Sequence, residues 1–484
     1  MHASERPQET AFVINVMLPR ERGASAARAI GRTAEDKLEE AVSLTGAIGL
    51  EVTAATTVNL ASIRPSTLIG TGVLAQWRER IDAEHPDVII FNATLTPVQH
   101  RNLERELRAK VLDRTALILE IFGERAQTRE GRLQVELAAL TFQRSRLVRS
   151  WTHLERQRGG AGFMGGPGES QLELDRRMLL ERIDKLKRDL QDVRRTRGLH
   201  RSARARQGAH VVALVGYTNA GKSTLFNALT GADILAKDML FATLDPTLRR
   251  LRLESGRELV LADTVGFISD LPHELVDAFR ATLEEVIEAD LILHVRDASN
   301  PEWEAQKRDV LDVLRSLGRI EQPEAPDRLP PPVTDPPRDP DLDEPVEEKA
   351  GGDTLVDMVP IIEVWNKVDR EGAAAIMAEA EHDPDFDRAF AVLRTSAVAG
   401  TGLDAVLETV DAALSDGEQD LELLIPYTAG AALAWLHEFS HVLSHEHDED
   451  GTRAMVRISD DDWASCRSGF RISRWPEARV AGSI

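Results

Sequence analysis

Two glycines, a lysine and a serine at fixed spacing are the residues best suited to chemistry in this chain. Gly216, Gly221, Lys222 and Ser223 match the pattern G-x-x-x-x-G-K-[ST]. In that pattern backbone N–H groups surround phosphates, the lysine reaches the β and γ phosphates, and the hydroxyl binds magnesium. A chance match is the alternative, but the apolar run before the glycines and the amphipathic pattern after them predict the strand, loop and helix that the motif requires. The loop is completed by Tyr217, Thr218, Asn219, Ala220 and Thr224.

A second segment supplies a carboxylate for the metal ion. Asp263, Thr264, Val265 and Gly266 follow an apolar run, so Asp263 is predicted at the end of a strand. There it can support magnesium, while Gly266 lets its backbone amide approach the γ phosphate. A plain turn containing an aspartate is the alternative, and the neighbouring phosphate motif disfavours it.

Two later segments indicate which base is bound. Asn366, Lys367, Val368 and Asp369 follow a strand-like run, and the Asp369 carboxylate can accept hydrogen bonds from N1 and N2 of guanine. Adenine offers no such pair of donors. Thr395, Ser396 and Ala397 end another apolar run, where a small residue lets the Ala397 amide approach guanine O6. In this order the four segments look like the signature of a GTP-binding G domain over residues 209–416.

Length and composition set the context for this site. A chain of 484 residues exceeds one ordinary core, so three or four domains are expected. The single cysteine, Cys466, excludes an intramolecular disulfide and fits a reducing compartment. Neither a signal peptide nor an apolar run long enough to span a bilayer is found, which predicts a cytoplasmic protein with no membrane span. The net charge of −22 conceals an uneven distribution.

The chain is expected to begin with two units ahead of the G domain. Residues 1–127 alternate strand-like and helical patterns and predict an α/β domain, with a helix at 26–45, a helix at 101–110 and strand-like character from Val111 onward. Residues 128–207 predict a hairpin of two long helices, at about 129–156 and 170–206, joined by a glycine-rich tip.

Positive charge concentrates in the second hairpin helix. Residues 176–206 hold 12 Lys or Arg against 4 Asp or Glu. A solvated helix face is the alternative, but a glycine tip flanked by arginines suits RNA phosphates. The predicted RNA contacts are Gly166, Pro167, Gly168, Arg176 and Arg177.

The last two regions carry less chemistry. Residues 321–353, with 11 Asp or Glu and 9 prolines, predict a disordered acidic insertion in the G domain. Residues 417–484 predict a small α+β domain with a helix at about 428–444, which would place His437, His441 and His445 on one helical face. A metal site there is conceivable, but no second element supplies ligands, so a polar helix face is preferred.

Taken together, the motifs resemble the HflX family of ribosome-associated GTPases. Residues 158–177, RGGAGFMGGPGESQLELDRR, resemble the glycine-rich loop and following helix of that family. Residues 263–268 resemble its second switch. Residues 241–247 resemble its first switch, and the resemblance implies that GTP is bound there by Phe241, Ala242, Thr243, Leu244 and Asp245.

The resemblance implies both an architecture and an activity. It implies an α/β fold in which a P-loop G domain is joined to an N-terminal α/β domain, a long helical hairpin and a small C-terminal α+β domain. It implies a GTP hydrolase that binds GTP and GDP, associates with the large ribosomal subunit and its RNA, and separates stalled or idle ribosomes. A signalling or scaffold G protein that gates protein partners is the alternative function. We expect a monomer.

The same motifs assign roles to individual residues. Thr243, Gly266 and Lys222 are the expected catalytic residues, with Ser223 and Thr243 as Mg²⁺ ligands and Asp263 behind them. Asn219 resembles a potassium-sensing asparagine, with a loop-stabilising amide as the alternative. Phe267 stands where many G domains place a water-orienting glutamine, so the isolated chain is expected to hydrolyse GTP slowly and to need a partner.

Overall fold

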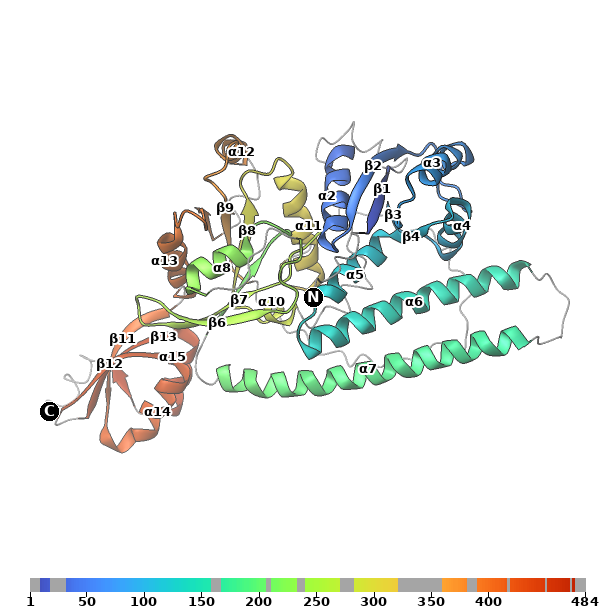
Figure 1. The fold of residues 1–484 in the computed structure, drawn as a ribbon. Coiled ribbons are helices and arrows are strands. Elements are labelled where there is room, and N and C mark those ends of the chain that lie inside the picture. Colours follow the sequence, from blue (N-terminus) through green and yellow to red (C-terminus); the bar gives the residue numbers. More distant parts are fainter. Residues whose placement is uncertain are drawn as a thin grey trace, which may run out of the picture.

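The structure is a computed structural model of the chain. It describes residues 9–17, 32–157, 167–205, 210–232, 240–269, 283–320, 359–380, 390–415, 418–448, 451–470 and 472–474. In these ranges the chain forms an α/β fold of three sheets and a long helical hairpin (Figure 1). The predicted acidic insertion at 321–353 lies outside the described residues.

The N-terminal unit is a four-stranded parallel sheet covered by helices. Its sheet order is β2-β1-β3-β4, and the apolar residues of β1 and β3 are buried. Capping boxes start two of its helices: Thr33 with Asp36 starts α2, and Thr96 with Gln99 starts α4. Its elements are β1 (Thr10–Met17), α2 (Ala34–Ala47), β2 (Glu51–Asn59), α3 (Thr71–Glu84), β3 (Val88–Asn92), α4 (Pro97–Leu107), β4 (Lys110–Asp113) and α5 (Arg114–Arg125).

One prediction for this unit was wrong. The apolar residues from Val111 onward form only the short strand β4 and then the helix α5. The Asp113 side chain accepts a hydrogen bond from the Ala116 amide and so starts the helix. Both faces of α5 are largely buried, and a helix buried in this way gives the continuous apolar run that also characterises a strand.

The helices of the hairpin, α6 (Arg129–Gln157) and α7 (Pro167–Ala205), lie side by side (Figure 1). Ile183, Leu186 and Leu190 of α7 are buried, while Arg182 reaches the Glu136 carboxylate of α6. The second helix starts earlier than predicted because proline is well accepted at a first helical position. Pro167 and Gly168 therefore belong to α7, and Gly166 lies outside the described residues.

The G domain has a six-stranded sheet of order β10-β9-β8-β5-β7-β6, in which only β6 runs antiparallel to its neighbour. Because β5, β7, β8 and β9 are parallel, their carboxyl ends meet at one edge of the sheet. Its elements are β5 (His210–Val215), α8 (Lys222–Thr230), β6 (Thr247–Arg252), β7 (Glu258–Asp263), α10 (Glu284–Ile287), β8 (Leu291–Asp297), α11 (Trp303–Ser316), β9 (Ile361–Asn366), α12 (Ala373–Ala380), β10 (Ala391–Arg394) and α13 (Leu403–Leu414).

The C-terminal unit is an antiparallel sheet of order β12-β13-β11-β14 packed against two helices. Arg257, between β6 and β7, joins this unit to the G domain by donating to the Glu418 carboxylate of β11, and it also donates to the Leu414 carbonyl at the end of α13. The elements are β11 (Glu418–Ile425), the 3-10 turn Tyr427–Ala429, α14 (Gly430–Phe439), β12 (His441–His447), β13 (Thr452–Ser459), α15 (Asp460–Gly469) and β14 (Ser473–Arg474).

The prediction that the histidines of this unit share one helical face was wrong. The helix ends at Phe439, Ser440 is extended, and His441 and His445 belong to β12. Pairing of β12 with β13 overrides the local helical pattern. Within the described residues no group of three His, Cys, Asp or Glu side chains is placed to hold a metal ion. None of the helices described combines the length and apolar character needed to cross a membrane.

Candidate nucleotide site

The phosphate loop connects β5 to α8 and is closely packed. A Cβ atom on Gly216, whose φ is +155°, would lie 2.2 Å from the Val295 carbonyl oxygen. One on Gly221, at φ +94°, would lie 2.2 Å from the Asn366 amide nitrogen. Both positions therefore require glycine. The loop can keep its backbone N–H groups close to an anion at the start of α8.

Lys222 is buried in the loop, where its ammonium group donates to the carbonyl oxygens of Gly216 and Tyr217 at 3.1 and 2.9 Å. Desolvation by burial lowers the pKa of Lys222 to about 8. Phosphate oxygens in the same cavity would favour the charged form, which suits a lysine that contacts the β and γ phosphates.

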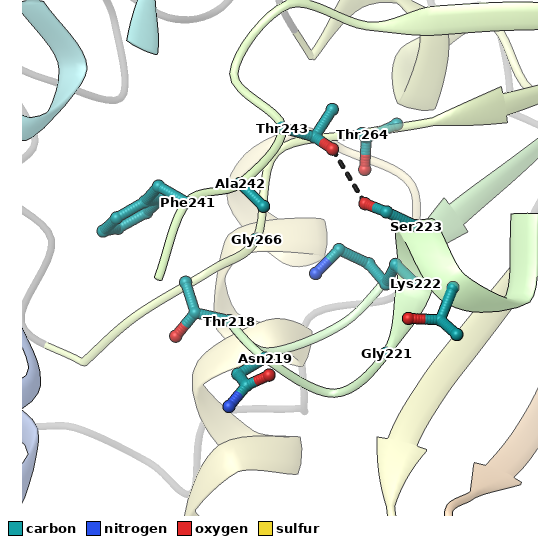
Figure 2. Close-up of a pocket in the computed structure, with 11 residues that line it drawn as sticks. Thr218, Asn219, Gly221, Lys222, Ser223, Phe241, Ala242, Thr243, Thr264 and Gly266 are labelled. Atoms are coloured by element: carbon teal, nitrogen blue, oxygen red, sulfur yellow. Dashed lines mark hydrogen bonds between the residues drawn. The ribbon is translucent and has the colours of Figure 1, made fainter. Parts of the chain in front are cut away.

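The carboxyl end of β7 brings the Asp263 carboxylate to the hydroxyl groups of Ser223 and Thr243, and Figure 2 shows these two hydroxyls side by side. Ser223 and Thr243 both donate to Asp263 Oδ2, at 2.7 and 2.8 Å, and their oxygens lie 2.8 Å apart. Burial raises the pKa of Asp263, and its Oδ1 atom is buried without a hydrogen-bond partner. Hydroxyl and carboxylate oxygens are ligands that Mg²⁺ accepts, so these three residues fit a magnesium ion and its supporting carboxylate.

The cavity beside these groups joins the phosphate loop to both switches (Figure 2). Gly266 lies so close that a Cβ atom there would be 2.9 Å from both the Lys222 nitrogen and the Thr218 Cα atom. The cavity is lined by Thr218, Asn219, Gly221, Lys222, Ser223, Thr224, Phe241, Ala242, Thr243, Thr264 and Gly266.

The two predicted base-recognition segments meet beside the phosphate loop. The Asn366 side chain donates to the Ala220 carbonyl at 3.1 Å and accepts from the Ala397 amide at 3.0 Å. Asp369 is exposed, and a hydrogen bond from the Ser396 hydroxyl holds its pKa below the usual value. The carboxylate is therefore charged at neutral pH, as an acceptor of guanine N–H groups should be. Thr395 and Val368 hold the two segments together through a backbone hydrogen bond of 3.2 Å.

Lys367 supports the phosphate loop from the same side. Its ammonium group donates to the Asn219 carbonyl at 2.6 Å and to the Asp297 carboxylate at 2.7 Å. Asn219 has a positive φ of 61°, a conformation that asparagine accepts more readily than most residues. Sequence reasoning missed Asp297, although an aspartate directly after a buried strand is the signal that identified Asp263.

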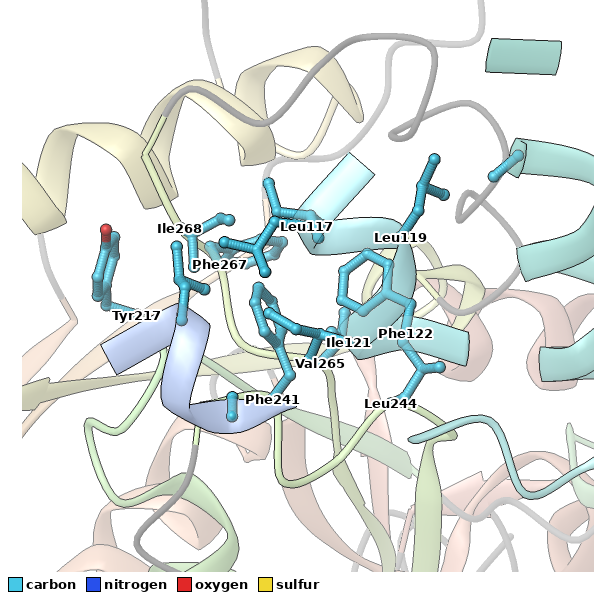
Figure 3. Packing of buried hydrophobic residues seen from close by; sticks show 14 of the residues in the cluster. Leu117, Leu119, Ile121, Phe122, Tyr217, Phe241, Leu244, Val265, Phe267 and Ile268 are labelled. Atoms are coloured by element: carbon cyan, nitrogen blue, oxygen red, sulfur yellow. The ribbon is translucent and has the colours of Figure 1, made fainter. Parts of the chain in front are cut away.

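Both switches place an aromatic ring in an apolar cluster (Figure 3). Phe267 is 1% exposed, and Phe241 packs edge-to-face on Phe122 of α5 with ring centroids 4.8 Å apart. Leu244 and Val265, expected beside the nucleotide, are also buried in this cluster. The cluster belongs to both domains, so the N-terminal domain packs directly on the switches.

A polar network that the sequence did not reveal lies next to the cluster. Tyr217 donates its hydroxyl hydrogen to Glu40 of α2, and Arg114 of α5 bonds to Glu40 and to the Ser269 carbonyl. Although burial opposes it, the charges of Arg114 and Arg32 hold the pKa of Glu40 below its usual value. These partners are 74 to 229 residues apart in sequence, and no local pattern marks them.

Comparison with known proteins agrees with this architecture. Three family models match the chain. They are described as GTP-binding GTPase N-terminal, at residues 35–123, GTP-binding GTPase Middle Region, at 125–204, and 50S ribosome-binding GTPase, at 211–323. GTPase HflX of Magnetococcus marinus is 44% identical over 422 residues, which cover 87% of this chain and 88% of that protein. The chain belongs to the HflX family of GTPases.

Another HflX protein matches over a shorter stretch of the chain. GTPase HflX of Escherichia coli K12 is 48% identical over 288 residues, covering 60% of this chain and 67% of that protein. Among solved structures, a GTP-binding protein from Sulfolobus solfataricus in complex with GDP is 21% identical, with a TM-score of 0.39, and covers 84% of this chain and 99% of that one. As a member of the HflX family, this chain is a GTP hydrolase that binds GTP and GDP, and G-domain GTPases generally use Mg²⁺.

Proposed function

We propose that this HflX-family GTPase binds the large ribosomal subunit through its helical hairpin, separates stalled or idle ribosomes, and hydrolyses GTP faster when bound. The observation that supports this best is the basic helix α7, whose Arg176 and Arg177 are exposed. The Arg177–Glu181 ion pair on this helix is also solvent-exposed, at 3.5 Å, and contributes little to stability. These arginines are thus available to phosphates, in a chain whose net charge is −22.

The geometry supports a role for each of the residues at the nucleotide. Mg²⁺ would neutralise charge on the phosphates, with Ser223 and Thr243 as ligands and Asp263 behind them. Lys222 holds the phosphate oxygens. The Gly266 amide and Thr243 are the groups available to orient the attacking water, because Phe267 points into the apolar cluster. A partner that orders both switches would therefore supply the missing positioning.

Reversing the charge of Arg176 and Arg177 tests the RNA contact. The double Arg→Glu variant should weaken binding to purified large subunits by at least tenfold and flatten its salt dependence, because fewer counterions are released. Cosedimentation with GTP, GDP and an uncleavable GTP analogue over a range of salt measures this. GTP affinity should be unchanged, since α7 contributes nothing to the nucleotide cavity.

A matched control makes the same charge change elsewhere. Arg101 and Arg105 are exposed on α4, and their double Arg→Glu variant should bind subunits like the wild type. If both variants lose binding equally, the hairpin has no special role. If the binding of wild-type protein to large subunits does not depend on salt or on the nucleotide, the ribosomal proposal fails. A G protein that gates protein partners then becomes the better interpretation.

A potassium site beside Asn219 is also proposed, from the resemblance of this position. Replacing sodium by potassium should then raise the GTP hydrolysis rate of the wild type, while Asn219→Ala should hydrolyse GTP equally in both salts. The backbone contact from Lys367 to the Asn219 carbonyl does not require the side chain and should survive. Equal wild-type rates in the two salts, with and without ribosomes, would reject the site and leave Asn219 as a loop-stabilising residue.

A further inference from the structure

The first switch is hydrogen-bonded to the start of the hairpin, and the residues that make this contact have no role in the nucleotide chemistry proposed above. Asp245 Oδ2 accepts hydrogen bonds from the backbone amides of Gln127 and Thr128, both at 2.9 Å, and its Oδ1 accepts from the Thr128 hydroxyl at 2.5 Å. All three donors lie immediately before α6, which begins at Arg129. A residue of one domain thus caps the first helix of another.

The sequence of α6 leaves room for this carboxylate. Thr128 is the N-cap of the helix, because its side-chain oxygen accepts from the Gly131 amide at 2.9 Å. A Cβ atom on Gly131 would lie 2.3 Å from Asp245 Oδ1 and 3.1 Å from Asp245 Cγ. Any side chain at this position would therefore displace Asp245. Glycine is unfavourable inside a helix, so its presence here needs a reason, and the approach of Asp245 provides one.

The carboxylate is also closely connected to the magnesium side of the site. Asp245 follows Thr243 by two residues, a span of at most about 7 Å. Leu244 between them is buried in the interdomain cluster, and Pro246 restricts the backbone of Asp245 to extended conformations. In this structure the Thr243 hydroxyl lies 2.8 Å from Ser223 and from Asp263, so switch I is closed over the site while Asp245 is bonded to α6.

We propose that the N-terminus of α6 is a positioning element for switch I: it holds Asp245, and through it Thr243, in the closed arrangement, and it loses Asp245 when switch I opens after hydrolysis. The state of the nucleotide and the position of the hairpin are thereby coupled through this contact. The contact itself depends on no ribosomal partner. Its use to transmit binding at the hairpin to Thr243 rests on the function proposed above.

Gly131→Ala is the decisive variant, because it alters no residue of the G domain. Hydrogen exchange at the Gln127 and Thr128 amides would be followed by mass spectrometry in the free protein, with Mg²⁺ and either GDP or an uncleavable GTP analogue. The wild type should show protection of these amides with the analogue and lose it with GDP. Gly131→Ala should exchange rapidly in both states and should lower the single-turnover hydrolysis rate about tenfold, with unchanged GDP affinity.

Gly123→Ala on α5 is the matched control. A Cβ atom on Gly123 meets nothing within 4 Å, so this variant should keep the nucleotide-dependent protection and the wild-type rate. If Gly131→Ala does not fold, Asp245→Ala offers the same test without added volume and should also abolish the difference in protection, because it removes the acceptor of both amides. Equal exchange of the wild-type amides with both nucleotides would overturn the proposal. So would nucleotide-dependent protection that persists in a folded variant with Gly131 or Asp245 replaced. These measurements contain no ribosomes, so failure of the ribosomal proposal would leave their outcome unchanged.

Discussion

Replacing Phe267 with alanine is expected to lower the free energy of unfolding by about 3–5 kcal/mol. The ring is 1% exposed and packs in a cluster formed by both switches and α5, so its removal leaves a cavity where two domains meet. Urea denaturation measures the change. Phe91, fully buried in the separate cluster on the other face of the N-terminal sheet, is the control of similar size, because Phe91→Ala should destabilise without freeing switch II.

The same variant separates stability from chemistry. Hydrolysis by the free wild-type protein is expected to be slow, and large subunits should raise the rate by about 10³-fold or more, within the range of partner-supplied activation. In Phe267→Ala the stimulated rate should stay within about tenfold of the wild type, because the ring lies in the apolar cluster and does not line the nucleotide cavity, so only the anchoring of switch II is lost. Single-turnover assays with and without subunits measure this.

Two results would contradict this account of Phe267. Rapid hydrolysis by the free protein, unaffected by subunits, would exclude activation by a partner. Complete loss of hydrolysis in a folded Phe267→Ala protein that still binds GTP and subunits would give the ring a direct role in catalysis, against its position in the apolar cluster.

Replacing Asp369 with asparagine is expected to change which nucleotide is bound. The substitution removes a charged acceptor for the guanine N–H groups, costing about 1.5–3 kcal/mol, or roughly 10- to 150-fold in GTP affinity. Xanthosine triphosphate should become competitive, because its 2-oxo group can accept a hydrogen bond from the new amide. Binding of labelled GTP in competition with both nucleotides measures the change.

A distant carboxylate provides the comparison. Asp404 is exposed on α13, and Asp404→Asn should leave GTP affinity and selectivity unchanged. If Asp369→Asn keeps its selectivity for GTP, a group other than Asp369 recognises guanine. That result would contradict the placement of this carboxylate, which lies beside the Ser396 hydroxyl and near the Ala397 amide.

The nucleotide site was largely predictable because its residues are encoded locally. Gly216 and Gly221 mark backbone positions that no other residue can occupy, and Asp263 directly follows a buried strand, so short patterns were sufficient. The topology of the sheet then brings the ends of separate strands together. The long helix α6 was also predicted, at about 129–156, close to its observed bounds.

The errors and omissions share a physical cause. The segment around His441 follows its pairing with β13, and α5 is covered on both faces, so tertiary contacts decided what local pattern could not. The contacts of Glu40 with Tyr217 and of Asp245 with Thr128 join residues of different domains that lie more than a hundred positions apart in sequence. Charged side chains at such junctions look like ordinary surface residues until the domains are placed together.

The length of α6 determines how far a small movement at its base is carried. A helix of 29 residues at 1.5 Å per residue is about 44 Å long. A rotation of about 5° at Thr128 would therefore displace the far end by nearly 4 Å, more than the length of a hydrogen bond, if the helix moves as a rigid rod. Its antiparallel packing against α7, through Ile183, Leu186 and Leu190 and the Arg182–Glu136 ion pair, stiffens the rod. The hairpin would therefore act as a lever: its base at Thr128 lies beside the phosphate site, and its far end makes the largest movement.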